Sequence, residues 1–305
     1  MGRTHQRRLI VKNGKRIFET AVHGVFLILG LITVACVLLI TVYLVISGIP
    51  AIREIGLIPF LFGDKWASTA AEPSYGILPF ILTSIYGTAG AILLGVPIGF
   101  FAAVYLAKVA SPRVKAVMQS AVSLLAGIPS VVYGFVGLLV LVKFFLKAGV
   151  HTGSCVLAAG ILLAVMLLPY LVSSCSETIL KAKERYLPAA DALGISPWYT
   201  VAAVILPASW KNILLSIVLA IGRAMGETMA VMMVMGNANL FPTLLGKGES
   251  IAAVIALEMG TAVVGSTHYH ALYAAGLVLM VLLFVINVGI TLLRDRLLRR
   301  EGGGK

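Results

Sequence analysis

Long apolar runs separated by short charged segments are the dominant pattern of this chain. A helix needs about 20 apolar residues to cross the roughly 30 Å hydrocarbon core of a bilayer. Six stretches are long enough, with expected bounds of 22–46, 78–107, 116–142, 154–176, 212–236 and 269–293. The alternating apolar and polar positions of a membrane β-barrel are absent from the sequence. The pattern therefore predicts an all-α integral membrane protein with six transmembrane helices.

Glycine and proline interrupt the second and third expected helices. The second contains Pro79 and Pro97, and the third contains AGIPSVVYGFVG at 126–137. Such residues either allow helices to pack closely or bend a helix beside a pathway. Both interpretations remain open from the pattern alone.

Two segments between the expected helices also carry apolar residues. Residues 48–77, which include Trp66 and Tyr75, are expected to form an outer loop at the membrane interface. Residues 251–265 are apolar but too short to span a bilayer, and they contain Glu258. We expect 251–265 to form a re-entrant or surface helix on the outer side.

The composition agrees with a membrane protein and excludes several other classes. Of the 305 residues, 60% are hydrophobic and only 12% are charged, whereas soluble domains carry about 25% charged residues. A soluble enzyme, a disordered protein and a disulfide-stapled secreted domain are therefore excluded. Cys36, Cys155 and Cys175 lie apart in apolar stretches, which is typical of packing residues and not of a metal site.

The basic residues predict the orientation of the chain. With both termini inside, 18 of the 24 Lys and Arg residues lie on the inner side and 5 on the outer side, as the positive-inside rule requires. The outer loops are then 48–77 and 237–268. The net charge of +12 is explained by this orientation and by anionic lipid, so nucleic-acid binding is not indicated.

The longest inner loop, 177–211, has the pattern of an ordered element. Gly194 follows a helical stretch as a helix stop, and Ser196 precedes Pro197 as an N-cap and first helical residue. We expect the second helix to run to Leu206 and Pro207. Such a helix–glycine–helix element either docks a soluble partner or lies on lipid headgroups, and both alternatives are open.

Arg223 and Glu227 are the two charges inside an expected transmembrane helix. Arg223 lies about 18 Å beyond Lys211 along a helix, and Glu227 one turn further on the same face. One interpretation is an ion pair that only stabilises the helix. The other is an anion site on a transport path, since arginine binds phosphate oxygens bidentately. Gly222 and Gly226 add a ledge for close packing against another helix.

Several motifs, in order along the chain, resemble the permease subunits of ABC importers. AADALGISPWYTVAAVILP (189–207) is similar to the loop that docks on the ATPase in that family, with Pro188 at the position of the family's glutamate. GRAMGETMAVMMVMGN (222–237) resembles the fifth-helix signature of the PstC type of phosphate-importer permease. Further similar segments are YGILPFILTSIYGT (75–88), GIPSVVYGFVG (127–137) and IALEMG (255–260).

This resemblance implies an ABC type I importer permease fold and a function in phosphate transport. The implied organisation is a cytoplasmic segment 1–21, a permease domain 22–293 with its core at about 75–293, and a basic tail 294–305. Arg223 and Glu227 would lie on the phosphate path. The residues implied to couple to the ATPase are Ala189, Ala190, Gly194, Leu206 and Pro207.

The resemblance also implies the partners. They are an ABC ATPase dimer that binds ATP and magnesium, a second permease of the PstA type, an extracytoplasmic phosphate-binding protein and membrane lipid. The expected location is the bacterial cytoplasmic (inner) membrane. No cofactor is expected in this chain, because the sequence contains no GxxxxGK[ST] nucleotide-binding loop.

Three other functions are compatible with a chain of six membrane helices. A permease for another oxyanion would use similar chemistry, and an ion-coupled secondary carrier would need no docking loop. An intramembrane hydrolase needs a nucleophile and a base within the membrane. The five histidines all fall at the ends of the expected helices or outside them, which disfavours the hydrolase.

Overall fold

The chain is almost entirely helical in a computed structural model that describes the backbone of residues 2–302 and the side chains of 19–20 and 22–292. The α-helices are α1 (Gly2–Ile55), α2 (Leu57–Phe62), α3 (Leu78–Lys108), α4 (Pro112–Ala126), α5 (Ser130–Gly137), α6 (Lys143–Lys147), α7 (Val156–Ala192), α8 (Pro197–Thr200), α9 (Leu206–Gly226), α10 (Met229–Met235), α11 (Ile251–Glu258) and α12 (Thr267–Gly302). Two π-helical segments, Leu138–Val142 and Val201–Ile205, join α5 to α6 and α8 to α9.

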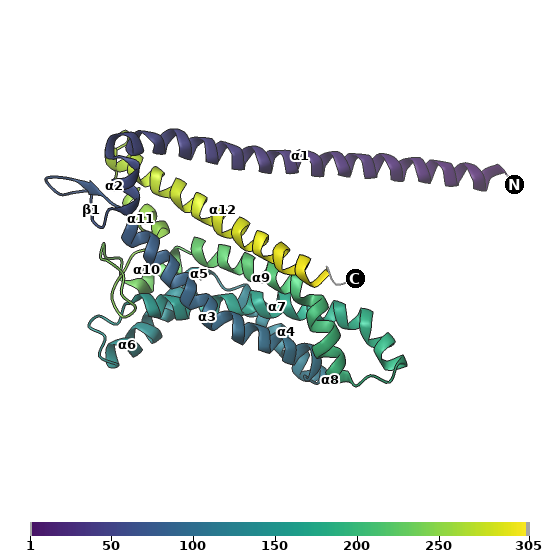
Figure 1. The fold of residues 1–305 in the computed structure, drawn as a ribbon. Coiled ribbons are helices and arrows are strands. Elements are labelled where there is room, and N and C mark those ends of the chain that lie inside the picture. The colour runs from purple at the N-terminus through teal and green to yellow at the C-terminus, as the bar shows by residue number, and fades with distance from the viewer. Residues whose placement is uncertain (1, 303–305) are drawn as a thin grey trace.

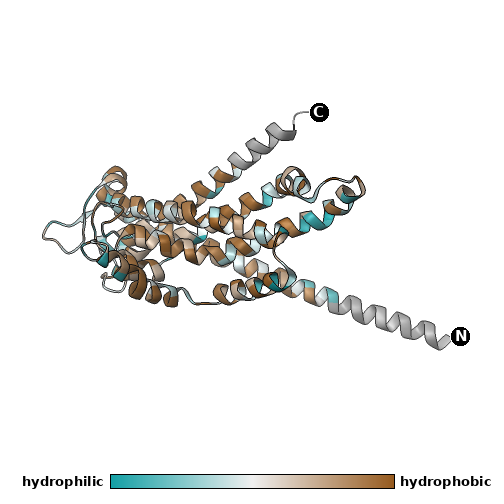
Figure 2. Cartoon of the chain, turned by 90° about the horizontal axis from the view of Figure 1, so that it is seen from below, coloured by the Kyte–Doolittle hydropathy of each residue, from teal (hydrophilic) through white to brown (hydrophobic). Residues whose placement is uncertain are grey.

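The predicted number of transmembrane helices is confirmed for the described residues. Six helical stretches are long and apolar enough to cross a membrane, namely Val22–Ile55, Leu78–Lys108, Ser130–Lys147, Val156–Ala192, Pro197–Gly226 and Thr267–Leu292. Apolar residues cover the middle of these helices, and hydrophilic residues gather toward their ends (Figure 2). The predicted tail, 294–305, has its side chains outside the described residues.

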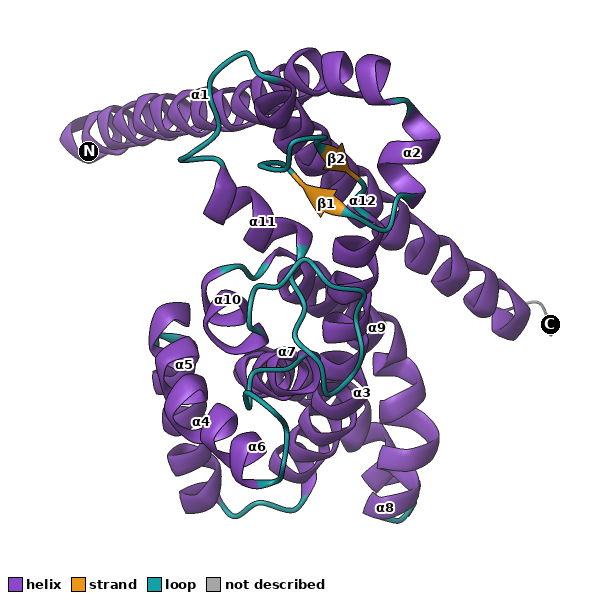
Figure 3. Cartoon of the chain, turned by 90° about the vertical axis from the view of Figure 1, so that its left-hand side faces the viewer, coloured by secondary structure: helices purple, strands orange, loops and turns teal. Residues whose placement is uncertain are grey.

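The helices form two groups. α7 lies among α3, α5, α9 and α10, while α1 and α12 pack against each other on one side (Figures 1 and 3). A Cβ atom at Gly48 of α1 would lie 3.0 Å from the Ala274 backbone of α12, so these two helices touch closely. α11 lies between the two groups (Figure 3). It is a short helix with Ile251, Ala253 and Val254 fully buried.

The third expected helix, 116–142, is broken instead of continuous. α4 ends at Ala126, and α5 begins at Ser130 after Gly127 and Pro129. A proline disfavours helical backbone in the residue before it, which explains the break. The Tyr133 hydroxyl donates to the Leu125 carbonyl at 2.9 Å and ties the two helices together across the break. The membrane-spanning segment therefore begins at Ser130.

The helix after Gly194 does not end at Leu206 and Pro207. It continues through the π-helical segment Val201–Ile205 into α9. The ring of a proline inside a helix collides with the carbonyl four residues earlier, and the wider π turn before Pro207 accommodates that ring. This part of the loop is therefore continuous with the fifth transmembrane helix.

α3 and α7 form the most closely packed pair in the first group. A Cβ atom at Gly99 would lie 2.9 Å from Leu171 Cβ, and one at Gly95 would lie 3.3 Å from the Ala164 carbonyl. For these two glycines the close-packing interpretation is confirmed. Small residues thus bring the backbones of these two helices into contact.

The outer segment 48–77 is only partly a loop. α1 continues to Ile55, and a two-stranded antiparallel hairpin pairs β1 (Trp66–Ala67) with β2 (Ser74–Tyr75). Trp66 is 3% exposed and Tyr75 9% exposed, and both belong to a core with Phe80 and Leu272. These two aromatic rings therefore pack into the protein and not against lipid, while the position of the segment at the membrane interface stays a prediction.

Candidate functional site

Arg223 and Glu227 lie on opposite sides of a helix break. α9 ends at Gly226, and Glu227 has extended backbone angles (φ −72°, ψ 122°). The Thr228 hydroxyl donates to the Gly226 carbonyl at 3.3 Å, which satisfies one of the carbonyls left free at a helix end. The expectation that the two charges share one helical face is wrong, because the fifth helix stops between them.

The carboxylate of Glu227 serves the helix that follows it. Its Oε1 accepts a hydrogen bond from the Ala230 backbone N–H at 3.3 Å, so Glu227 caps the first turn of α10. The described part of the chain contains two ion pairs, Lys181–Glu177 and His268–Glu258. A mutual pair between Arg223 and Glu227 is therefore not formed among the described residues.

Arg223 is exposed on the surface of the single chain. It lies in the last turn of α9, three residues before the helix ends at Gly226. The arginine is thus exposed beside the break between α9 and α10 and is not buried within the bundle.

The two helix breaks lie near each other because the helices that follow them are in contact. A Cβ atom at Gly134 of α5 would lie 2.9 Å from Ala230 Cα of α10. Gly134 is the fifth residue of α5 and Ala230 the second residue of α10. Interrupted helices at mid-membrane depth direct free backbone groups toward a polar pathway, and their N-terminal ends favour anions.

A small cavity lies beside Glu227. Its volume for a water-sized sphere is about 10 Å³, enough for about one water molecule. Glu227, Thr83, Ser84, Thr88 and Ser250 supply its oxygen atoms. The Thr83 and Ser84 hydroxyls donate to the Pro79 and Phe80 carbonyls of their own helix. Glu227 therefore lines a small cavity whose other walls carry both apolar and hydroxyl-bearing side chains.

The helix surface at Gly222 and Gly226, expected as a ledge for close packing, is not packed closely against another helix of this chain in the described residues. A Cβ atom at Gly226 would meet nothing within 4 Å, and one at Gly222 would lie 3.9 Å from Asn287 Nδ2. Packing of this ledge against another helix stays a prediction, and a partner subunit would have to supply that helix.

The inner loop has the predicted helix stop and cap. Gly194 has a φ of +66°, and the Ile195 N–H donates to the Ala190 carbonyl at 3.0 Å, a pattern that closes a helix around glycine. Ser196 Oγ accepts from the Tyr199 N–H at 3.3 Å.

The other predicted coupling residues differ in exposure. Ala189 and Pro207 are exposed, Leu206 is half-buried and Ala190 is 6% exposed. Three large apolar side chains at the tip, Leu193, Trp198 and Tyr199, are 76%, 66% and 63% exposed. Sequence reasoning did not single out these three residues.

A second charged cluster lies at the opposite end of the bundle. Glu258 accepts hydrogen bonds from Trp66 Nε1 at 3.0 Å and from Ser68 Oγ at 3.3 Å. His268 Nε2 lies 2.7 Å from the same carboxylate. Glu258 thereby joins the hairpin, α11 and the start of α12. The charged position in an apolar segment was visible in the sequence, but its partners were not.

Glu249 lies near this cluster and is 3% exposed. Burial raises the pKa of its carboxyl to about 7, and the charge of Glu258 contributes to the same shift. The neutral form of Glu249 is therefore stabilised in the folded protein.

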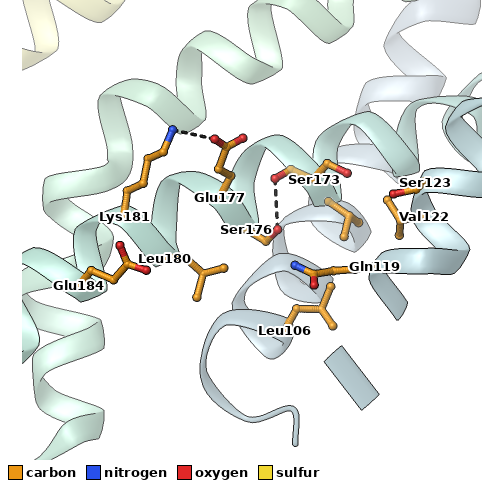
Figure 4. Close-up of a pocket in the computed structure, with 11 residues that line it drawn as sticks. Leu106, Gln119, Val122, Ser123, Ser173, Ser176, Glu177, Leu180, Lys181 and Glu184 are labelled. Carbon is orange, nitrogen blue, oxygen red and sulfur yellow. Dashed lines mark hydrogen bonds and ion pairs between the residues drawn. The ribbon is translucent and has the colours of Figure 1, made fainter. Parts of the chain in front are cut away.

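A larger cavity of about 600 Å³ lies between α3, α4 and α7 near the inner loop (Figure 4). Its charged lining residues are Glu177, Lys181 and Glu184, and Lys181 is paired with Glu177 at 2.6 Å. One carboxylate remains in excess, so the lining repels an anion. The larger cavity is therefore not the anion site, and Arg223 and Glu227 do not line it.

Comparison with known proteins places the sequence in a transport context. Residues 95–300 match the model of a family described as "Binding-protein-dependent transport system inner membrane component". The chain is 33% identical over 297 residues to the probable ABC transporter permease protein YqgH of Bacillus subtilis (strain 168), covering 95% of this chain and 96% of that relative. It is 34% identical over 266 residues to the phosphate transport system permease protein PstC of Xylella fastidiosa (strain 9a5c), covering 80% and 81%. A PstC of Haemophilus influenzae is 29% identical, with 96% of this chain and all of that relative covered.

Proposed function

Because the chain belongs to the family of binding-protein-dependent transport system inner membrane components, we propose that it is a permease subunit of an ATP-driven importer of inorganic phosphate. It forms half of the translocation pathway. Relatives that match over most of the chain are phosphate transport system permeases by name. Six apolar helices in the described residues are consistent with a multi-pass membrane protein.

The observation that carries this proposal is the position of Arg223. A lone arginine facing lipid at mid-membrane depth costs about 2.5–3.5 kcal/mol on insertion scales. Arg223 is exposed on the single chain in the last turn of α9, and α10, which follows the break after Gly226, packs against α5. Its face is therefore suited to a polar pathway shared with another subunit and unsuited to lipid.

The chemistry of the two charged residues fits a protonated phosphate. The Arg223 guanidinium binds two phosphate oxygens at once and keeps its proton at all physiological pH values. Glu227 accepts a hydrogen bond from a phosphate hydroxyl, which a fully deprotonated oxyanion lacks. Because Glu227 is held by α10 and not by Arg223, each residue is free to contact a different part of the anion.

The energy for transport comes from a separate subunit. The partners we propose are an ATPase dimer that binds ATP and magnesium, a second permease of the PstA type and an outer phosphate-binding protein. The inner loop 177–211 docks on the ATPase through residues 186–196, with Gly194 shaping the turn. Both termini lie in the cytoplasm, and the Glu258 cluster faces the binding protein.

Reconstitution in vesicles tests this function against the alternatives. The chain is co-expressed with its candidate ATPase, second permease and binding protein, and radioactive phosphate uptake is measured with and without ATP. We expect uptake only from the complete complex with ATP. Uptake by this chain alone, driven by an ion gradient, would identify a secondary carrier. Faster uptake of sulfate than of phosphate would identify a permease for another oxyanion.

A further inference from the structure

Lys108 holds the start of the inner coupling helix at two points. It is the last residue of α3, and its Nζ donates to the Pro197 carbonyl of α8 at 2.7 Å. The same Nζ lies 3.7 Å from the centre of the Trp198 ring. An ammonium group has three donors and is attracted to the face of an indole, so one side chain fixes both a backbone carbonyl and a ring.

A second lysine, on α7, also contacts the inner end of α3. Lys183 of α7 donates to the Ala107 carbonyl at 3.1 Å. The last carbonyls of a helix lack partners within it, and a cation at that end satisfies them and complements the helix dipole. The inner end of α3 is therefore held between the inner extension of α7 and the start of α8.

The outer half of α3 reaches the candidate phosphate path. Thr83, Ser84 and Thr88 of α3 line the small cavity that also contains Glu227. Between its two ends α3 is packed on α7 through Gly95 and Gly99. One helix thus connects the contact with Pro197 and Trp198 to the surroundings of Glu227 across the membrane.

We propose that Lys108 is a positioning residue that couples α8 to α3 and so transmits ATPase movements to the phosphate path. This inference rests on the proposed docking of 177–211 to an ATPase. Lys108 contacts neither phosphate nor ATP in this scheme. It keeps α8 and α3 moving together, since a displaced α8 would otherwise slide past the end of α3.

Three variants and a control test whether Lys108 couples α8 to α3. Lys108→Gln removes the charge and the attraction to the ring. Lys108→Arg keeps both interactions, because a guanidinium donates to carbonyls and stacks on indole. Trp198→Leu removes the ring but leaves the carbonyl contact. Arg113→Gln, at an exposed cation in the first turn of α4, is the matched control at the inner side.

The measurement is the ratio of phosphate imported to ATP hydrolysed by the complete complex in vesicles. We expect Lys108→Gln and Trp198→Leu to assemble and hydrolyse ATP, with that ratio reduced at least about fivefold, the smallest change that an ordinary coupling free energy produces. Lys108→Arg should restore the wild-type ratio, and Arg113→Gln should not change it. The double variant Lys108→Gln/Trp198→Leu should have about the same ratio as either single variant, because both substitutions remove the same contact between Lys108 and the Trp198 ring.

Two outcomes overturn the inference while leaving the function intact. One is a wild-type ratio in Lys108→Gln, and the other is a ratio in Lys108→Arg as low as in Lys108→Gln. If Lys108→Gln does not assemble, Trp198→Leu compared with Trp198→Phe decides, since phenylalanine keeps an aromatic face and should retain more coupling. Failure of the wild-type complex to import phosphate with ATP would instead reject the proposed function.

Discussion

Arg223 carries a fixed charge whose shape matters as much as its sign. We predict that Arg223→Gln abolishes ATP-dependent phosphate uptake and that Arg223→Lys restores only a small part, because an ammonium lacks the planar fork. Uptake in vesicles measures both effects. Assembly of the complex and phosphate capture by the binding protein should be unchanged. Wild-type uptake by the Arg223→Gln variant would show that Arg223 does not bind the transported anion.

Glu227 has a structural role in α10 that can be separated from its charge. A glutamine at 227 can still accept the Ala230 N–H bond, so Glu227→Gln should assemble normally and lose transport, with an altered pH dependence. Glu227→Ala removes the cap and should also lower stability by about 0.5–2 kcal/mol. Uptake against pH and thermal unfolding of the purified complex distinguish these effects. Normal uptake by Glu227→Gln at every pH contradicts a role for the charge.

Glu249 makes stability depend on pH. Its pKa is raised to about 7 in the folded protein from an ordinary value of 4.5, so the unfolded chain loses this proton first as the pH rises. Below about pH 4.5 both the folded and the unfolded state carry this proton, and Glu249 costs no stability. Between about pH 4.5 and pH 7 the free energy of unfolding falls, because only the unfolded chain releases the proton readily. Glu249→Gln should therefore be more stable than wild type by about 3 kcal/mol at pH 8. The difference should vanish toward pH 4.5 in thermal unfolding of the complex, and a constant difference would refute it.

At the scale of elements, gaps between charges were enough to predict six membrane helices, because bilayer thickness sets their length. The break at Gly127 and Pro129 was indicated by residue type, although its effect was left open. The break after Gly226 was not, since no proline marks it and it is stabilised by the Glu227 cap. The contact of Trp66 with Glu258 joins residues 192 positions apart, and no local pattern encodes such a pairing.

The turn between α7 and α8 depends on the backbone of Gly194 and not on space around it. A Cβ atom there would meet nothing within 4 Å, but φ is +66°. Gly194→Val should therefore prevent ATPase binding and leave membrane insertion intact. Gly194→Asn, the matched control, should bind the ATPase because asparagine tolerates this conformation. Co-purification of the ATPase is the readout, and equal binding by both variants would reject the docking assignment.

At the scale of the whole molecule, the orientation is open to direct labelling. Single cysteines at Ser196 and Thr69, in a chain whose three native cysteines are replaced by serine, mark the inner turn and the outer hairpin. A membrane-impermeant thiol reagent added to intact cells should label the cysteine at 69 and not the one at 196. Labelling of position 196 from outside would invert the proposed topology.

The exposed guanidinium of Arg223 also bears on the life of the newly made chain. In the proposed complex a second permease covers that face, so the chain alone carries an unneutralised cation against lipid, at a cost of about 2.5–3.5 kcal/mol. A destabilised protein is degraded faster in the cell. We therefore expect the cellular level of the chain to fall when the second permease is not made.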